Sequence, residues 1–342
     1  MSPKWTSRVP TLLDCTLREG PYECRFGSEE MAIIAKQLQQ SGITHIEVGA
    51  ETGLGTNPQV DDIDQIRTVA AAAPGTRVGV IAGASSTTVD DLRRVVDAGA
   101  GFIRVAAAVT DSTTALPLIE AVADWNVPVT FNAIKCYAVE QQQLLSIAKD
   151  VTAAGAHVFY LVDSAGSMLP RTVHRRTAAL HDLGIQVGFH GHDNLALAVA
   201  NSLAALDAGA IAADGTLRGI GRSAGNAQLE VLVKAAQQHG SLTEVDGDAL
   251  CRLSEELIAE RRLRDRGVSF LDIAMGEGRF HSERLDLARE VAHAYQVPLE
   301  SLVRATGQSD PVAPDRNLLE QTAALLRADP PAEAAHSWPG HW

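Results

Sequence analysis

Positive charge is scarce in this sequence of 342 residues, which has 29 Lys and Arg against 42 Asp and Glu and a formal net charge of −13. A negative field repels phosphate backbones, so the charge balance argues against a nucleic-acid partner. Aromatic residues make up only 4 % of the chain. Alanine, valine, leucine and glycine dominate instead, and such small side chains suit close packing between helices and a sheet.

Cysteine is also rare, and its spacing matches no metal or redox motif. The four cysteines are Cys15, Cys24, Cys136 and Cys251, and we expect them to be reduced thiols. Residues 1–8 lack the apolar stretch of a signal peptide, and no apolar run approaches the length that spans a membrane. These absences predict a cytoplasmic protein with no membrane partner.

What the sequence does contain is a repeated alternation of short apolar runs and amphipathic stretches. The expected strands are Thr11–Asp14, His45–Gly49, Val78–Ile81, Phe102–Ala106, Val129–Ala133, Val158–Val162, Val187–His190 and Ile211–Asp214. Helical segments such as Glu29–Gln40, Val89–Ala98, Gln141–Ala154 and Leu195–Ala208 lie between them. Eight strand–helix units over roughly 230 residues are typical of a closed (β/α)8 TIM barrel, and less so of an open sheet.

The strand–helix alternation stops after Gly240, and the rest of the chain reads as helices. We therefore expect a TIM-barrel catalytic domain over residues 8–242 and a C-terminal helical domain over residues 243–328. The last residues, 329–342, are rich in Pro, Ala and His, and we expect a disordered tail there.

The strongest local motif is a pair of histidines, His190 and His192, at the end of the seventh expected strand. Side chains two residues apart on a strand point to the same side, so both imidazoles would face the barrel opening. That arrangement suits two ligands of one divalent ion. The alternative is a pair of packed or solvent-facing histidines, which would be the better interpretation if no other ligand were near.

Two further ligand types follow the neighbouring strands of the expected barrel. A carboxylate lies in Asp14–Gly20, after the first strand, and Asn226 lies in a glycine-rich loop after the eighth. In a closed barrel these strands are consecutive, so oxygen and nitrogen ligands would meet at the carboxyl-terminal rim, where barrel active sites lie. The alternatives are a surface ion pair of Arg18 and Glu19, and a phosphate cradle or plain turn in the loop.

The blocks Thr11–Gly20, Gly188–Asn194 and Asp214–Glu230 resemble the DRE-TIM metallolyases, a family of carbon–carbon lyases and synthases. The Asp, Arg and Glu that give this family its name would fall on Glu19, Arg18 and Glu47. Within the family, the chain is most similar to the 4-hydroxy-2-oxovalerate aldolase branch over nearly its whole length, with the C-terminal segment Ala274–Gln296 included.

The resemblance implies a role for each matching residue. Glu19, His190 and His192 would bind the divalent ion, joined by Asn226. The ion would be Mn²⁺ in the first place, with Mg²⁺ or Co²⁺ as alternatives. The implied substrate is a 4-hydroxy-2-oxo acid, which gives pyruvate enolate and an aldehyde.

The remaining roles concern the reacting atoms. Arg18 would stabilise the enolate oxygen, as a developing oxyanion needs a cation. Glu47 would complete the catalytic set, and Ser164 would contact the substrate carboxylate.

The chain departs from the aldolase pattern at three positions. Glu19 replaces an Asp, Tyr22 replaces the histidine that acts as base, and His281 stands where the aldolases have a tyrosine. We interpret the last two as an exchange in which His281 takes over proton transfer, because a phenol of pKa about 10 is a poor base. The alternative is chance substitution at both positions.

Three other functions remain open on the sequence alone. A Claisen-type acyl-CoA synthase or lyase fits Glu19, and a non-catalytic barrel that docks a dehydrogenase fits the loss of the histidine at Tyr22. Schiff-base chemistry at Lys135 is a third alternative. The aldolase resemblance further implies a homo-oligomer and an aldehyde dehydrogenase as partner.

Overall fold

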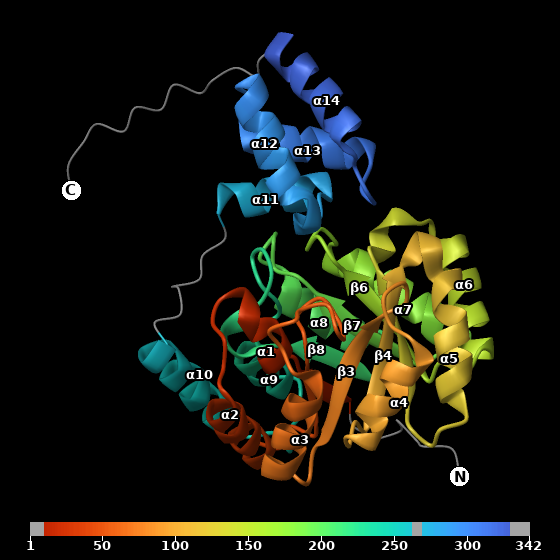
Figure 1. Cartoon of the computed structure of the whole chain (residues 1–342), viewed down its shortest axis with the longest axis vertical. Coiled ribbons are helices and arrows are strands. Elements are labelled where there is room, and N and C mark those ends of the chain that lie inside the picture. Colours follow the sequence, from red (N-terminus) through yellow and green to blue (C-terminus); the bar gives the residue numbers. More distant parts are fainter. Residues whose placement is uncertain (1–9, 262–268, 329–342) are drawn as a thin grey trace. The chain divides into compact units, whose positions relative to one another are not determined.

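The apolar runs form eight parallel strands that close into one barrel in the computed structural model, which describes residues 10–261 and 269–328 (Figure 1). Each strand pairs with the next, and β1 closes the barrel by pairing with β8. The strands are β1 (Thr11–Asp14), β2 (His45–Val48), β3 (Arg77–Gly83), β4 (Phe102–Ala108), β5 (Val129–Ile134), β6 (Val158–Asp163), β7 (Val187–Gly191) and β8 (Ala212–Gly215). The expected TIM barrel is confirmed.

Large and small residues alternate between neighbouring strands of the barrel. A Cβ atom on Gly79 of β3 would collide with the ring of Phe102 on β4, and one on Gly188 of β7 would collide with Tyr160 on β6. Phe102 and Tyr160 are fully buried in a cluster with Leu13 and other strand residues. The two glycines therefore make room for the two rings, so the inside of the barrel is a packed core.

Helices surround the barrel and follow most of its strands. They are α1 (Thr16–Glu19), α2 (Ser28–Gln40), α3 (Asp62–Ala72), α4 (Val89–Asp97), α5 (Leu116–Ala123), α6 (Gln141–Ala153), α7 (Pro170–His181), α8 (Ala198–Asp207), α9 (Leu229–Gln237) and α10 (Gly247–Arg261). Side chains start some of them: Thr88 caps α4 through the Asp91 amide, and Asp61 caps α3 through the Asp64 amide. None of the helices in the described ranges is long and apolar enough to cross a membrane.

The chain divides into two units, Met1–Val268 and Ser269–Trp342. The sequence pattern puts the domain change after residue 242, but α10 belongs to the first unit. Its residues Leu250, Leu253 and Leu257 are part of the core cluster of the barrel, and α10 contacts α2 and α9. The strand–helix pattern therefore stops in the sequence before the barrel unit ends, because α10 still belongs to that unit.

The second unit has its own helices and its own core. It contains α11 (Phe270–Gly278), α12 (Leu285–Tyr295), α13 (Leu299–Ser309) and α14 (Arg316–Ala328). Met275, Phe280 and Leu302 are among its buried residues. Gly278 and Gly307 allow α11 and α13 to approach closely, since a Cβ on Gly307 would collide with the Gly278 carbonyl. The expected tail, 329–342, lies outside the described residues.

Candidate active site

The two histidines of the seventh strand meet at the carboxyl end of the barrel. His190 lies in β7 and His192 just beyond it, and their ring centroids are 5.3 Å apart in an edge-to-face arrangement. Both are buried. The period of two along the strand accounts for the shared direction of the two rings.

Each imidazole is fixed through its Nδ1 atom. His190 Nδ1 lies 2.9 Å from Asp214 Oδ2, and His192 Nδ1 lies 3.1 Å from the carbonyl oxygen of Gly225. Both partners are acceptors, so Nδ1 is the donor in each ring and Nε2 is the nitrogen that a metal ion would use. A carboxylate or carbonyl on the far nitrogen is the usual support of a histidine that binds a metal.

Glu19, which follows β1, and Asn226, which follows β8, lie near this pair of histidines, at the place where β1 and β8 close the barrel. Glu19 ends α1, and Asn226 forms an isolated β-bridge with His192. Burial acts to raise the pKa of Glu19, but Arg18 and then the two histidines outweigh it and hold that pKa below its usual value. The carboxylate is therefore ionised, as a metal ligand must be.

Asn226 has one polar atom without a partner. Its Nδ2 donates to the carbonyl oxygen of Ile220 at 2.8 Å, whereas its buried Oδ1 has no hydrogen-bond partner among the described residues. Gly221 keeps space here, since a Cβ atom on it would collide with Asn226 Nδ2 and lie 2.9 Å from Glu19 Oε2. An unsatisfied carbonyl oxygen beside an ionised carboxylate and two imidazoles fits a divalent ion.

A buried charge network lies beneath these residues. Arg18 pairs with Glu19 at 2.6 Å and with Glu47 at 2.5 Å, while Arg104 pairs with Glu47 at 3.2 Å and with Asp214 at 2.5 Å. Burial acts to raise the pKa of Glu47, but Arg104 and Arg18 outweigh it and lower that pKa. The network holds the guanidinium of Arg18 next to the proposed metal ligands.

A second cluster, Cys15, His190 and Asp214, has ligand atoms within 4.8 Å of one another. It fits a metal ion less well. Burial raises the pKa of the Cys15 thiol well above its usual value, so it is not a thiolate. Arg104 also lies within the cluster, with Nη1 3.7 Å from Cys15 Sγ, and its charge would repel a cation. Asp214 is better described as the carboxylate that orients His190.

Tyr22 lies close to Glu19 and is engaged on both sides of its hydroxyl. The hydroxyl accepts from Arg222 Nη2 at 2.6 Å and from Nε at 3.1 Å, and it lies 3.4 Å from the carbonyl oxygen of Glu51. Burial, followed by the charge of Glu19, raises the pKa of Tyr22. A neutral phenol held in this way is a weak proton acceptor.

Ser164 and Lys135 lie at the same end of the neighbouring strands. Ser164 follows β6, and its hydroxyl accepts the backbone N–H of Lys135 at 2.9 Å. The preceding residue, Asp163, accepts the His192 amide through its carbonyl at 3.2 Å. The structure therefore brings Ser164 to the rim that carries the histidines.

His281 belongs to the second unit, where it precedes the 3₁₀ turn Ser282–Arg284. Its Nδ1 lies 3.5 Å from Glu283 Oε2. Its participation in the site remains a prediction.

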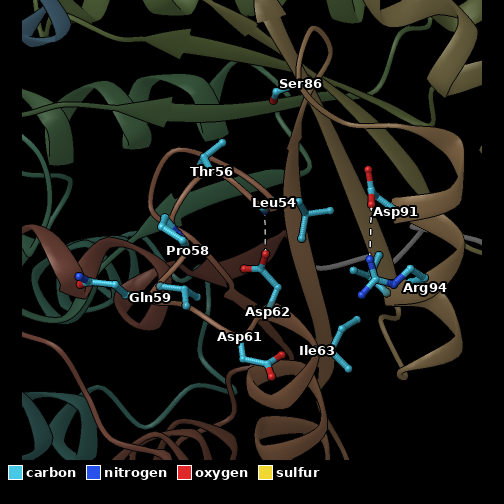
Figure 2. Close-up of a pocket in the computed structure, with 13 residues that line it drawn as sticks. Leu54, Thr56, Pro58, Gln59, Asp61, Asp62, Ile63, Ser86, Asp91 and Arg94 are labelled. Carbon is cyan, nitrogen blue, oxygen red and sulfur yellow. Dashed lines mark hydrogen bonds and ion pairs between the residues drawn. The ribbon is translucent and has the colours of Figure 1, made fainter.

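A surface hollow of about 750 Å³ lies apart from these residues, between the β2–α3 loop and α4. Figure 2 shows Asp62 pointing into the loop that forms one wall. Asp62 accepts the backbone amides of Ala50 at 2.7 Å and Gly55 at 2.8 Å, and burial raises its pKa. Since Glu51 is part of the same loop, Asp62 shapes the backbone whose carbonyl contacts Tyr22 and Arg18.

The sequence motifs do not identify Arg104, Asp214 or Arg222. An arginine inside the apolar run Phe102–Ala106 is the signal that marks Arg104, because a charge in a buried strand needs partners. Asp214 is the last residue but one of the eighth strand, and Arg222 lies in the glycine-rich loop. Their contacts come from strands far apart in the sequence, so one sequence alone does not show them.

Comparison with known proteins indicates one family. The model of the HMGL-like family matches residues 9–257. The chain is 31 % identical to 4-hydroxy-2-oxovalerate aldolase 2 of Nocardia farcinica over 340 residues, which are 96 % of this chain and 98 % of that protein. It is 31 % identical to oxaloacetate decarboxylase of Mycobacterium tuberculosis over 315 residues, 89 % of this chain and 93 % of that protein.

The same fold occurs in a solved structure, the carboxyl transferase domain of Rhizobium etli pyruvate carboxylase. The TM-score is 0.77 at 18 % identity, over 94 % of this chain and 61 % of that one. At this identity the likeness concerns the fold alone. The similarity to the aldolase of Nocardia farcinica, together with the family match, confirms the expected resemblance to the aldolase branch.

Proposed function

Because the chain belongs to the HMGL-like family, we propose that it is a divalent-metal-dependent aldolase, which cleaves a 4-hydroxy-2-oxo acid into pyruvate and an aldehyde. The observation that carries this proposal is the pair of imidazoles, each fixed through Nδ1, beside an ionised carboxylate. Supports of this kind are typical of metal-binding histidines.

The ion would be held by Glu19, His190 and His192, with the unpartnered Oδ1 of Asn226 as a further ligand. When bound, it supplies Lewis-acid chemistry, since it polarises the keto group and stabilises negative charge on that oxygen. Two oxygen ligands beside two imidazoles support Mn²⁺ as the first choice, with Mg²⁺ or Co²⁺ as alternatives.

Arg18 would stabilise the enolate. Cleavage breaks the C3–C4 bond of the substrate, the electron pair stays with the pyruvate half, and its oxygen becomes negative. The guanidinium of Arg18 is preorganised for that charge, because Glu47 and the Glu51 carbonyl hold it at 2.5 and 3.1 Å. Ser164 would donate its hydroxyl proton to the carboxylate of the 2-oxo acid.

Aldol cleavage also removes a proton from the 4-hydroxyl group. Tyr22 is a weak candidate, since its pKa is raised and its oxygen accepts from Arg222. We assign the proton transfer to His281, because an imidazole changes its charge near neutral pH.

Decarboxylation of oxaloacetate is the second candidate function, and Tyr22 is the observation that favours it. Loss of CO2 forms the same pyruvate enolate without removing a proton from a hydroxyl group. A site that keeps the metal ligands and Arg18 but has a tyrosine in place of the base suits this reaction. The similarity to oxaloacetate decarboxylase of Mycobacterium tuberculosis points the same way.

One assay distinguishes these reactions. The purified protein with Mn²⁺ would be offered 4-hydroxy-2-oxo acids, oxaloacetate, and acyl-CoA with 2-oxo acids. Pyruvate and aldehyde from the first panel support the aldolase, and pyruvate with CO2 from the second supports the decarboxylase. Free thiol from the third alone would contradict both and favour the Claisen-type alternative.

The assembly and partners extend the proposal. We expect a homo-oligomer in the cytoplasm and an aldehyde dehydrogenase that takes the product, as the resemblance to the aldolases implies. Sedimentation of the purified chain tests the first expectation. The second expectation is tested by mixing the chain with the dehydrogenase and measuring the rate of aldehyde oxidation. A rate that is higher when the chain produces the aldehyde than when free aldehyde is added supports a partnership.

A further inference from the structure

Tyr22 and Arg222 form a pair beside the proposed metal site. Besides the two hydrogen bonds to the Tyr22 hydroxyl, the guanidinium carbon of Arg222 lies 5.0 Å from the ring centroid. The backbone N–H of Arg222 lies 3.4 Å from Glu19 Oε2. The side chain of Arg222 is therefore fixed next to a proposed ligand without being one.

Two guanidinium groups flank the Tyr22 hydroxyl. The carbonyl oxygen of Glu51 accepts from Arg18 Nη1 at 3.1 Å and from the Tyr22 hydroxyl at 3.4 Å. Arg18 thus lies beyond Glu51 on one side of the hydroxyl, and Arg222 contacts it directly. If Arg18 works on the enolate half of the substrate, Arg222, on the other side of the Tyr22 hydroxyl, is placed to meet the departing half.

The two arginines differ in how their charge is compensated. Arg18 has two carboxylate partners, Glu19 and Glu47. Within the described part of the chain, the half-buried Arg222 makes no ion pair, and its side-chain hydrogen bonds go to a neutral phenol. The charge of Arg222 lowers the pKa of the nearby Glu19, but its guanidinium has no carboxylate at contact distance among the described residues. A half-buried guanidinium of this kind in a protein of net charge −13 points to an anionic ligand, because a partly desolvated charge is costly without a close partner.

We propose that Arg222 binds a second carboxylate, on the departing half of the substrate, so that the enzyme selects 2-oxo acids that are dianions. The inference rests on the proposed function, since pyruvate enolate is the shared half. Tyr22 occupies the Nε side of the guanidinium, which leaves the end-on edge of Nη1 and Nη2 for two parallel hydrogen bonds to a carboxylate. Tyr22 is then a positioning residue for Arg222.

Two kinds of dianion share this chemistry. In oxaloacetate, the C3–C4 bond breaks, its electron pair forms the enolate, and the second carboxylate leaves as CO2. In a 4-hydroxy-2-oxo diacid, the same bond breaks, the 4-hydroxyl proton passes to a base, and the carboxylate stays on the departing carbonyl compound. Arg222 loses its ionic partner in the first reaction, so it aids substrate binding alone, whereas in the second it keeps the partner through the transition state.

The test compares three substrates in the full chain with Mn²⁺: oxaloacetate, 4-hydroxy-2-oxopentanedioate and the monoanion 4-hydroxy-2-oxopentanoate. Arg222→Ala should lower the ratio of kcat/KM for 4-hydroxy-2-oxopentanedioate to that for the monoanion by about 10–100-fold, the size expected for one charge-assisted pair. For oxaloacetate it should raise KM with little change in kcat/KM, because that interaction is lost in the transition state. Arg222→Lys should recover part of the ratio. Tyr22→Phe should lower it less, chiefly through a higher KM for the diacids.

Two further measurements separate the possible failures. Exchange of pyruvate methyl protons with deuterated solvent reports enolate formation without a departing half, and its absence in the wild type would remove the proposed function together with this inference. Exchange in the wild type, combined with an unchanged substrate ratio in Arg222→Ala, would overturn the inference alone. Loss of all aldol cleavage in Tyr22→Phe would make Tyr22 the base and overturn it too. Mn²⁺ affinity checks that Arg222→Ala keeps the site, because the amide that meets Glu19 remains.

Discussion

The buried guanidinium of Arg104 connects the carboxylate that holds Arg18 with the carboxylate that orients His190. Its guanidinium contacts Glu47, which holds Arg18, and Asp214, which orients His190. Burial acts to raise the pKa of Asp214, but Arg104 and then the hydrogen bond with His190 outweigh it and keep the group ionised. The position of a proposed metal ligand and that of the proposed enolate-stabilising arginine therefore depend on the same residue.

Replacing Asp214 with Asn should weaken metal binding. The amide still accepts from His190 Nδ1, but it no longer carries the negative charge that makes the imidazole a stronger ligand. We expect the Kd for Mn²⁺ to rise about 10–100-fold, as is usual for such supports, and titration calorimetry measures it.

Asp163→Asn is the matched control, because Asp163 is also buried at a strand end but its side chain accepts the amides of Ser167 and Met168. Its Kd should stay close to that of the wild type. Equal Kd values in Asp214→Asn and Asp163→Asn would contradict the role of Asp214.

At this scale, the sequence is informative where the proposed ligands lie in short motifs at strand ends. His190, His192 and Glu19 stand in such motifs, and the strand period gives the direction of the histidines. Arg104 acts through partners on other strands, and Arg222 through Tyr22 in the turn Gly20–Tyr22, and a single sequence does not show which of these segments meet. The two arginines of the site are therefore less predictable from the sequence than its proposed metal ligands.

At the scale of the element, the barrel strands were predictable because each is a buried apolar run with turn residues at both ends. The expected strand Thr11–Asp14 agrees with β1 at both ends, and Phe102–Ala106 is two residues shorter than β4. The loop after β8 was not predictable in the same way. Its shape depends on Gly221, whose φ of +152° accompanies close contacts with Asn226 and Glu19.

Gly221→Ala should damage the proposed metal site with little effect on the rest of the fold. The new Cβ would push Asn226 and Glu19 apart, so the Kd for Mn²⁺ should rise about tenfold or more. Gly99→Ala carries a comparable left-handed strain at φ +112° with nothing within 4 Å of its Cβ. Both variants should lower Tm through backbone strain, and Gly221→Ala should lower it more because of its clash. A Kd that rises equally in both would contradict the loop argument.

At the scale of the whole molecule, the chain consists of a barrel unit and a second, helical unit. The change from strands to helices in the sequence does not mark the unit boundary, because α10 packs on the barrel through Leu250, Leu253 and Leu257. His281 is the residue of the second unit with a predicted chemical role.

His281→Ala should separate aldol cleavage from decarboxylation. If His281 accepts the 4-hydroxyl proton, the variant should lose about 10²–10⁴-fold in aldol cleavage, the usual contribution of a general base. It should still bind Mn²⁺ and decarboxylate oxaloacetate, which needs no such base. His281→Tyr should not restore cleavage unless Tyr22→His is added. Unchanged cleavage in His281→Ala would leave a different group as the base.

The stability of the protein should depend on pH through Asp14, which is fully buried at the end of β1. Burial, only partly offset by hydrogen bonds from Thr16 at 3.0 and 2.7 Å, raises its pKa from 3.8 to about 7. Between those values the folded state keeps a proton that the unfolded state has lost, so the free energy of unfolding falls as pH rises, by up to about 1.4 kcal/mol per pH unit.

Asp14→Asn imitates the protonated form at every pH. The difference in unfolding free energy, wild type minus Asp14→Asn, should therefore fall from pH 5 to about 7 and then level off. For Asp163, whose pKa is raised by burial to about 6, the same difference measured with Asp163→Asn should level off about one unit lower. Denaturant titrations across this range measure both, and a difference that is constant with pH for Asp14 would contradict a protonated carboxyl group in the folded barrel.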